Sequence, residues 1–233
     1  QIRVFQPEVL QRPLVGAGCP DFDLATTGID YAVGDAFGIF PTNDPALADA
    51  VIAALDAPPD FPIGGRALRD VLIDGVSLGA APDMLFQLFS YIAGGERRQK
   101  AKALAAGEDP DGDAATLDVL AAIQKFAGAR PDPEAFIEAL DPLQPRLYSI
   151  ASSPKVDDKR MALCVDTVRY AVDGRSRLGV ASTFLGERLQ TRVRQFHDAN
   201  GGDPRLQCQR PDFTRVRCAG LVVVRPDHQI PTG

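Results

Sequence analysis

Short apolar runs alternate with turn formers over residues 21–41, and this pattern predicts strands joined by tight turns. Phe22-Asp-Leu24 and Phe37-Gly-Ile39-Phe40 are two of these runs, and Gly34-Asp35 stands just before the second. Glycines between aromatic and β-branched runs are typical of strands that connect through short turns. We therefore expect β-structure in this part of the chain.

A helical block is predicted from residue 45 to residue 141. Pro45 suits the first turn of a helix, and Ala46–Leu55 is rich in alanine and leucine without a breaker. Helical spacing or composition recurs in further stretches separated by proline and glycine. These are Arg66–Ile73, Asp83–Ile92, Glu96–Ala106, Leu117–Phe126 and Glu134–Leu140.

After the helical block the pattern becomes extended again. We expect strands at Arg146–Ser153 and, with near alternation of apolar residues, at Met161–Tyr170, followed by a turn at Asp173-Gly174. Gly179–Leu185 is also expected to be extended before a helical Leu185–Leu189. Strands on both sides of a helical block predict an α+β protein in which a β-structure is interrupted by a helical insertion.

The chain is divided accordingly into five segments. One strand, Leu221–Val224, is predicted near the C-terminus amid arginine, proline and glycine. The segments are 1–20 (unplaced), 21–44 (first β part), 45–141 (helical insertion), 142–189 (second β part) and 190–233 (unplaced and arginine-rich).

Composition narrows the class of protein. The 233 residues are 45% hydrophobic and 24% charged, which suffices for one large or two small domains. The net charge of −6 argues against nucleic acid as a main partner. No apolar run reaches the length of a membrane span, no signal-peptide core is present, and the four cysteines are scattered, so we expect a cytoplasmic protein with reduced thiols and no metal site.

Charge is distributed unevenly along the chain. Residues 1–20 carry a net charge of +1 and residues 190–233 carry +3, so the body between them carries −10. The ends therefore differ in character from the body.

The strongest cluster of candidate chemistry is Arg146-Leu147-Tyr148-Ser149. A strand with a fixed cation, an aromatic ring and a hydroxyl can hold a phosphate and stack a planar ring, and alternation places Arg146 and Tyr148 on one face. By composition alone, an ordinary edge strand with a surface arginine accounts for the same residues.

This cluster resembles the flavin-binding signature of the ferredoxin-NADP reductase superfamily, and the whole string Arg146–Ser153 is similar to that of the sulfite-reductase type of diflavin reductase. Three more segments agree with this family in order and spacing. They are Tyr31–Asp44, Val165–Tyr170 and Gly179–Ser182. The resemblance covers residues 21–189.

The resemblance implies site roles position by position. Arg146 would bind the FAD pyrophosphate, Tyr148 would stack on or beside the isoalloxazine, and Ser149 would lie near the reactive N5 edge as the candidate catalytic residue. The other implied cofactor-binding residues are Leu147, Cys164, Val165, Asp166, Tyr170, Gly179, Val180, Ala181 and Ser182. The last four match a loop that opens a helix, where glycine lets the backbone approach and the helix N-terminus favours anions.

The resemblance also implies the architecture and the reaction. It implies an antiparallel β-barrel FAD-binding domain of the ferredoxin-reductase type, interrupted by an all-α connecting insertion, in an NADPH-dependent flavoprotein reductase. Electrons would pass from NADPH through FAD to FMN and a haem and iron-sulfur partner, with NADPH and FMN bound outside this chain. Residues 191–233 contain no glycine-rich nucleotide loop, so the NADPH-binding module is expected to be absent and the enzyme incomplete.

Two alternatives stay open. The chain could be the FAD domain of another diflavin reductase, such as an NADPH-haemoprotein or nitrate-assimilation reductase. It could also be a non-catalytic fragment, because missing barrel strands would leave sheet edges unpaired. Asp166 departs from the family pattern, which has a small residue at that position.

Overall fold

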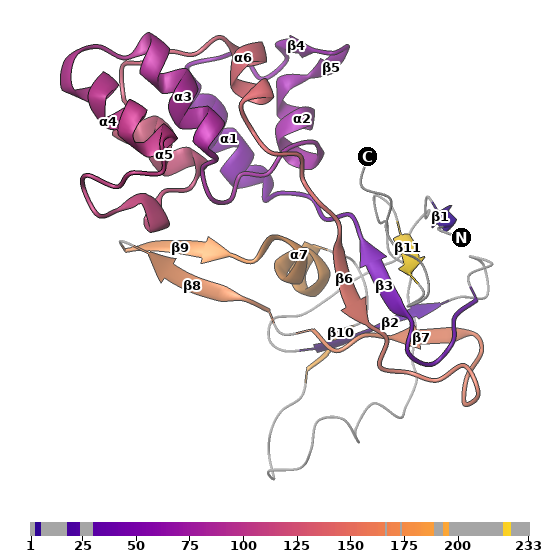
Figure 1. Cartoon of the computed structure of the whole chain (residues 1–233). Coiled ribbons are helices and arrows are strands. Elements are labelled where there is room, and N and C mark those ends of the chain that lie inside the picture. The colour runs from indigo at the N-terminus through magenta and orange to yellow at the C-terminus, as the bar shows by residue number, and fades with distance from the viewer. Residues whose placement is uncertain are drawn as a thin grey trace. The chain divides into compact units, whose positions relative to one another are not determined.

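The structure, a computed structural model, describes residues 3–5, 18–23, 30–165, 167–172, 174–188, 193–195 and 221–224. The chain falls into two units, each with its own core (Figure 1). The strand unit comprises Gln1–Pro41, Pro145–Ala171 and Arg175–Gly233, and the helical unit comprises Thr42–Gln144 with Val172–Gly174. The α+β composition expected from the sequence is confirmed.

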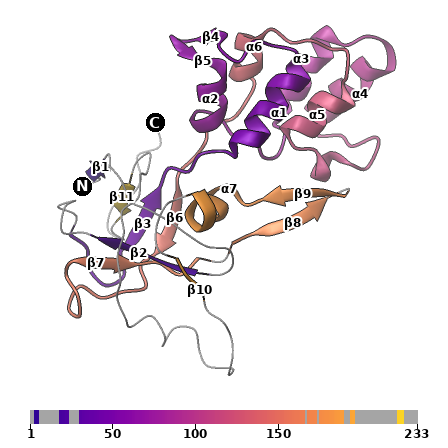
Figure 2. The same ribbon diagram turned by 180° about the vertical axis from the view of Figure 1, so that it is seen from behind.

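The described helical unit contains six α-helices, and they gather together in both views of the ribbon (Figures 1 and 2). They are α1 (Pro45–Leu55), α2 (Leu68–Asp74), α3 (Asp83–Ile92), α4 (Gly95–Ala105), α5 (Val119–Lys125) and α6 (Pro133–Glu138). A 3-10 turn, η1 (Ala114–Thr116), and a hairpin of β4 (Pro62–Ile63) and β5 (Arg66–Ala67) complete the unit.

Most helices differ from their predicted bounds by one or two residues, and the start of α2 has an identifiable cause. Arg66 and Ala67 form a strand that pairs with Pro62–Ile63, so the helix expected to begin at Arg66 begins at Leu68. Gly64 and Gly65 cause the difference, because both have positive φ (56° and 82°) and close a hairpin turn directly before these residues.

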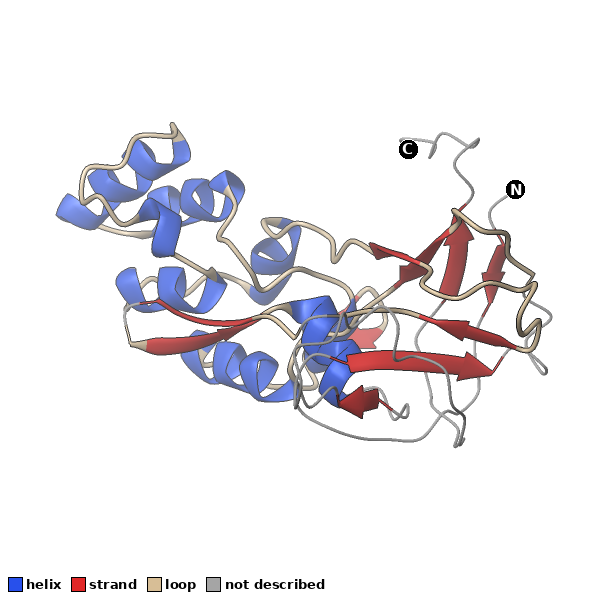
Figure 3. Ribbon diagram, turned by 90° about the horizontal axis from the view of Figure 1, so that it is seen from below, coloured by secondary structure: helices blue, strands red, loops and turns tan. Residues whose placement is uncertain are grey.

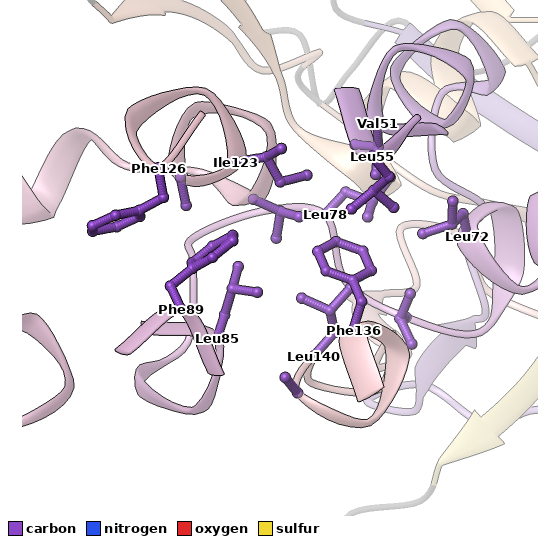
Figure 4. Packing of buried hydrophobic residues seen from close by; sticks show 14 of the residues in the cluster. Val51, Leu55, Leu72, Leu78, Leu85, Phe89, Ile123, Phe126, Phe136 and Leu140 are labelled. Carbon is purple, nitrogen blue, oxygen red and sulfur yellow. The ribbon is translucent and has the colours of Figure 1, made fainter. Parts of the chain in front are cut away.

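The core of the helical unit is built from one face of each amphipathic helix (Figure 4). Phe89 of α3 stacks on Phe126 with ring centroids 5.0 Å apart, a favourable aromatic arrangement. The residues labelled in the figure are Val51, Leu55, Leu72, Leu78, Leu85, Phe89, Ile123, Phe126, Phe136 and Leu140.

A buried asparagine ties the start of this unit to its interior. The Asn43 side-chain amide donates to the carbonyl oxygens of Leu72 and Val76, each at 2.7 Å. The end of the unit is held at the same place, because the Leu143 amide donates to the Gly75 carbonyl at 3.0 Å. Both chain connections of the helical unit are thus fastened around the C-terminus of α2.

The strand unit consists of short strands and one short helix (Figure 3). The strands are β1 (Arg3–Phe5), β2 (Gly18–Asp23), β3 (Ala36–Ile39), β6 (Arg146–Ser149), β7 (Arg160–Ala162), β8 (Arg169–Val172), β9 (Arg175–Leu178), β10 (Val193–Gln195) and β11 (Leu221–Val224). The sheet orders are β1-β11-β3-β6, β10-β2-β7 and β8-β9. Neighbouring strands in the first two sheets pair antiparallel.

Among the described strands these sheets remain separate and do not close into a barrel. The strand predicted at Leu221–Val224 is confirmed as β11, which lies between β1 and β3. Within residues 1–20 and 190–233, the structure describes only β1, the first residues of β2, β10 and β11. None of the helices in the described parts is long and apolar enough to cross a membrane.

Two extended segments are shorter than predicted. The single strand expected at Met161–Tyr170 is two strands, since β7 ends at Ala162 and β8 begins at Arg169. Beyond Ala162 the ladder is reduced to an isolated bridge between Leu163 and Ile150. The Arg146–Ser153 strand likewise ends at Ser149, where β3 no longer offers a partner.

The segment expected to be extended at Gly179–Leu185 is helical instead. It forms α7 (Val180–Thr183) and continues as a π-helix, η2 (Phe184–Arg188). The Thr183 amide closes the turn by donating to the Gly179 carbonyl at 2.9 Å, and the Thr183 hydroxyl donates to the same oxygen at 2.9 Å. The backbone groups of this segment are therefore paired within a helical turn, although Val180 and Thr183 are β-branched residues that favour strands.

The two faces of α3 allow a test of the helical core with adjacent residues. Leu85 is fully buried whereas Met84 is 58% exposed. Leu85→Ala should lower the free energy of unfolding by about 3 kcal/mol, because it removes packed methyl groups and leaves a cavity. Met84→Ala should change it by less than about 0.5 kcal/mol. Urea unfolding followed by far-UV circular dichroism measures both, and equal effects of the two substitutions would contradict this core.

Candidate functional site

The centre of the candidate site is strand β6, and its register fixes which side chains share a face. Tyr148 lies opposite Phe37 and Arg146 lies opposite Ile39 in the antiparallel ladder. Directly opposed residues point to the same side of a sheet, so Arg146 and Tyr148 share a face with two fully buried residues of β3. Leu147 and Ser149 occupy the other face.

Tyr148 is partly buried and packs against the core of the strand unit. Burial raises the pKa of its hydroxyl above the usual 10.0, and the nearby Arg146 charge opposes that shift. The ring is thus neutral at physiological pH and held by packing. An accessible face of such a ring is suited to stacking on a planar ligand.

The other residues of β6 present polar and apolar atoms to solvent. Arg146 and Ser149 are exposed, and Leu147 is 49% exposed although it is apolar. The Arg146 guanidinium donates to the Pro145 carbonyl at 3.3 Å, which keeps it close to its own strand. Four consecutive residues of one strand therefore carry a cation, an aromatic ring and a hydroxyl.

The helical turn at α7 lies in the same unit and beside β6 in both views (Figures 1 and 2). The two elements share a core, because Phe184 and Leu185 are buried in the cluster that contains Phe37 and against which Tyr148 packs. This shared packing keeps the β6 residues and the start of α7 in one piece of structure.

Gly179 is required at the start of this turn. A Cβ atom at this position would lie 2.7 Å from the Ser182 hydroxyl oxygen and 2.8 Å from the Val168 Cβ atom. The Gly179 amide donates to the Val168 carbonyl at 2.9 Å, and the Ser182 hydroxyl accepts from the Val168 amide at 3.0 Å and donates to the Gly179 carbonyl at 3.2 Å. The turn is therefore docked on residues 167–168.

These contacts change the roles expected within the Gly179–Ser182 loop. The Gly179 amide and the Ser182 hydroxyl are engaged inside the protein. The amides of Val180, Ala181 and Ser182 belong to the first helical turn, where amides have no acceptor within the helix. Those three amides, rather than that of Gly179, are the donors that this turn can offer to an anion.

The remaining residues predicted for the site have mixed surroundings. Cys164 and Tyr170 have exposed side chains. Val165 is buried in the core, so a ligand could meet its backbone but not its side chain. Asp166 lies outside the described residues.

Two hydroxyl groups near β6 were not singled out by the sequence pattern. The Tyr31 hydroxyl lies 2.8 Å from the Ser152 hydroxyl and donates to the Arg160 carbonyl at 3.0 Å, and Tyr31 is only 7% exposed. Burial raises the pKa of Tyr31 above its usual 10.0. The sequence signal for this contact is weak, because the hydroxyls stand on segments that the helical block separates.

Two aspartates in the loop between α4 and α5 form ion pairs with lysines of the same unit. Lys125 pairs with Asp111 at 2.6 Å and with Asp113 at 2.9 Å, and Lys100 pairs with Asp111 at 3.0 Å. These lysines hold the pKa of the Asp111 carboxyl below its usual value. Within the described residues, no group of three metal-ligating side chains is found.

The close packing at Gly179 gives a test of the turn. Gly179→Ala should lower the free energy of unfolding by about 1–3 kcal/mol, because the new methyl group overlaps neighbouring atoms and α7 must shift. Gly79→Ala is the matched control, since a Cβ atom there would meet only the Ser77 hydroxyl at an ordinary 3.4 Å. Thermal unfolding compares the two variants, and a Gly179→Ala protein as stable as Gly79→Ala would contradict this packing.

Comparison with known proteins bears on the same segments. The FAD binding domain family matches residues 80–184, a stretch that includes β6 and α7. The chain is 34% identical over 174 residues to the sulfite reductase (NADPH) flavoprotein alpha-component of Photorhabdus laumondii, covering 73% of this chain and 28% of that protein. The corresponding protein of Mannheimia succiniciproducens is 33% identical over 178 residues, covering 73% of this chain and 29% of that protein.

A third relative extends the match. The alpha-component of Salmonella typhi is 32% identical over 191 residues, which is 77% of this chain and 31% of that protein. The chain thus spans about three tenths of the length of the curated relatives it matches. Residues 80–184 thus match the FAD binding domain family, and over about three quarters of its length the chain is similar to sulfite reductase (NADPH) flavoprotein alpha-components.

Proposed function

We propose that this chain is the FAD-binding part of an NADPH-dependent flavoprotein reductase of the sulfite reductase type. The observation that carries the proposal is that β6 and the helix begun by α7 pack on one core. Arg146 and Tyr148 share a strand face there, and the first-turn amides of α7 belong to the same packed unit. A fixed cation, an aromatic ring and helix-terminal amides are the groups that a flavin dinucleotide needs.

FAD fits the residues that are present. The exposed Arg146 guanidinium would hold the pyrophosphate together with the amides of residues 180–182, since both offer donors to an anion. The accessible side of the Tyr148 ring would stack on or beside the isoalloxazine, and Ser149 would lie near its N5 edge. The missing Cβ at Gly179 allows α7 to dock closely enough for this arrangement.

Neighbouring residues would complete the site with backbone or surface contacts. Cys164, Tyr170 and Leu147 would contact the cofactor through their exposed side chains. Val165 would contact it through its backbone, because its side chain is buried. Tyr170 would lie near the adenosine half of the cofactor. Asp166 belongs to the same proposed set.

The two units suggest an architecture for the proposed protein. The strand unit would be a ferredoxin-reductase-type antiparallel barrel, and the helical unit would be an all-α connecting domain inserted within it. Supporting this, residues of the strand unit stand on both sides of Thr42–Gln144 in the chain. The NADPH-binding module would lie outside this chain.

Bound FAD would accept electrons from NADPH and pass them on singly through FMN. The chain's own part is to bind and orient the flavin, with Ser149 placing a hydroxyl at the N5 edge and no general base required. The partners would be an FMN-binding module and a haem and iron-sulfur subunit, and the cytoplasmic location favoured by the sequence belongs to the same proposal.

Fluorescence titration of the purified chain with FAD tests the proposal. The chain should bind FAD and turn yellow, and it should not oxidise NADPH alone. Arg146→Ala should weaken FAD binding by about tenfold to a hundredfold, because it removes charge-assisted bonds to the pyrophosphate.

Arg66→Ala provides the matched control. Arg66 is an exposed arginine on a strand of the helical unit, where it pairs with Asp74 at 2.7 Å. This variant should bind FAD as the unmodified chain does. A chain that binds no FAD would refute the proposal, and robust NADPH turnover by the chain alone would refute the absence of an NADPH module.

A further inference from the structure

Strand β7 has different partners along its two edges. On one edge it pairs with β2, from Asp21 opposite Ala162 to Asp23 opposite Arg160. On the other edge the Ala162 carbonyl accepts from the Ala151 amide at 2.8 Å, and the backbone ladder goes no further than this contact and the Ile150–Leu163 bridge. The Ala162 amide and the Arg160 carbonyl on this edge need partners of another kind.

Two side-chain hydroxyls supply those partners. The Ala162 amide donates to the Ser152 hydroxyl oxygen at 2.9 Å, and the Tyr31 hydroxyl donates to the Arg160 carbonyl at 3.0 Å. The two hydroxyls lie 2.8 Å from each other. Because the single Tyr31 proton goes to Arg160, the Ser152 proton must go to the Tyr31 oxygen.

The result is a closed relay from the Ala162 amide through Ser152 and Tyr31 to the Arg160 carbonyl. It begins and ends on β7, and it holds the turn that follows β6 against that strand. Tyr31 is almost fully buried in the core against which Tyr148 also packs, so its own position is fixed. Low local polarity strengthens such a chain of hydrogen bonds.

We propose that Tyr31 is a positioning residue for the flavin, acting through Ser152 on the end of β6. Ser149 is the last residue of β6, and only Ile150 and Ala151 separate it from Ser152. Fixing Ser152 therefore limits where the Ser149 hydroxyl and the Tyr148 ring can lie. This inference rests on the proposed FAD-binding function and adds to it a residue that does not touch the cofactor.

The relay can be tested with variants that differ by one hydroxyl group. Tyr31→Phe removes the relay's central hydroxyl, and Ser152→Ala removes the one that meets β7. Ser152→Thr keeps the hydroxyl and should rescue the loss. Tyr91→Phe is the matched tyrosine control, because Tyr91 is 69% exposed on α3 and its hydroxyl accepts a hydrogen bond from the Gln87 side-chain amide at 3.2 Å.

Three measurements are made on each FAD-loaded protein: the FAD dissociation constant, the visible circular dichroism of the bound flavin, and its midpoint potential. Tyr31→Phe and Ser152→Ala should each weaken FAD binding on the order of tenfold, because ligand groups that are no longer preorganised must be ordered on binding. They should also change the flavin dichroism and shift the potential. Ser152→Thr and Tyr91→Phe should match the unmodified chain.

The outcomes separate this inference from the proposed function. If all five proteins bind FAD with the same affinity, dichroism and potential, the relay does not position the flavin, even if the melting temperature of Tyr31→Phe falls. If Tyr31→Phe does not fold, the Ser152→Ala and Ser152→Thr pair decides the question by the same readouts. If the unmodified chain binds no FAD, the proposed function fails and the inference fails with it.

Discussion

The antiparallel pairing of β3 with β6 is the constraint on which the strand unit depends. These strands stand on opposite sides of residues 42–144 in the chain, yet Ala36–Ile39 and Arg146–Ser149 pair residue for residue. The pairing places Tyr148 against the core and leaves Arg146 and Ser149 accessible. Pairing strands so distant in sequence carries a large loop-closure cost, which a compact helical unit between them reduces by holding its two ends together around the C-terminus of α2.

The candidate site is built mostly from groups that also hold the fold together. Gly179 permits the close approach of α7 to Val168, and Ser182 bonds the same residue with its hydroxyl. Tyr31 and Ser152 complete the edge of β7 while they fix the end of β6. The groups that remain accessible to a ligand are the exposed Arg146 side chain, part of Tyr148 and the first amides of α7. Because the fold already holds these groups in place, less conformational entropy is lost when a ligand binds.

Local pattern located the helices of the helical unit but missed α7 and the strand boundaries. The helix at Asp83–Ile92 is found as predicted, because its apolar spacing matches one buried face. Strands end where a partner strand ends, so the pattern over 161–170 could not reveal the break after Ala162. The family resemblance pointed to Gly179–Ser182 as a cofactor loop. The hydrogen bond from the Gly179 amide to the Val168 carbonyl is a tertiary contact that no local sequence pattern signals. The Tyr31–Ser152 contact was hidden for the same reason.

The central claim is that FAD binds on the surface made by β6 and the start of α7. Titrating FAD into the isotopically labelled chain and following backbone amide resonances by NMR tests this claim most directly. The account predicts that the amides of residues 146–149 and 180–182 shift as FAD is added, while those of α3 in the helical unit stay in place. Shifts confined to the helical unit, or no shifts under saturating FAD, would contradict it.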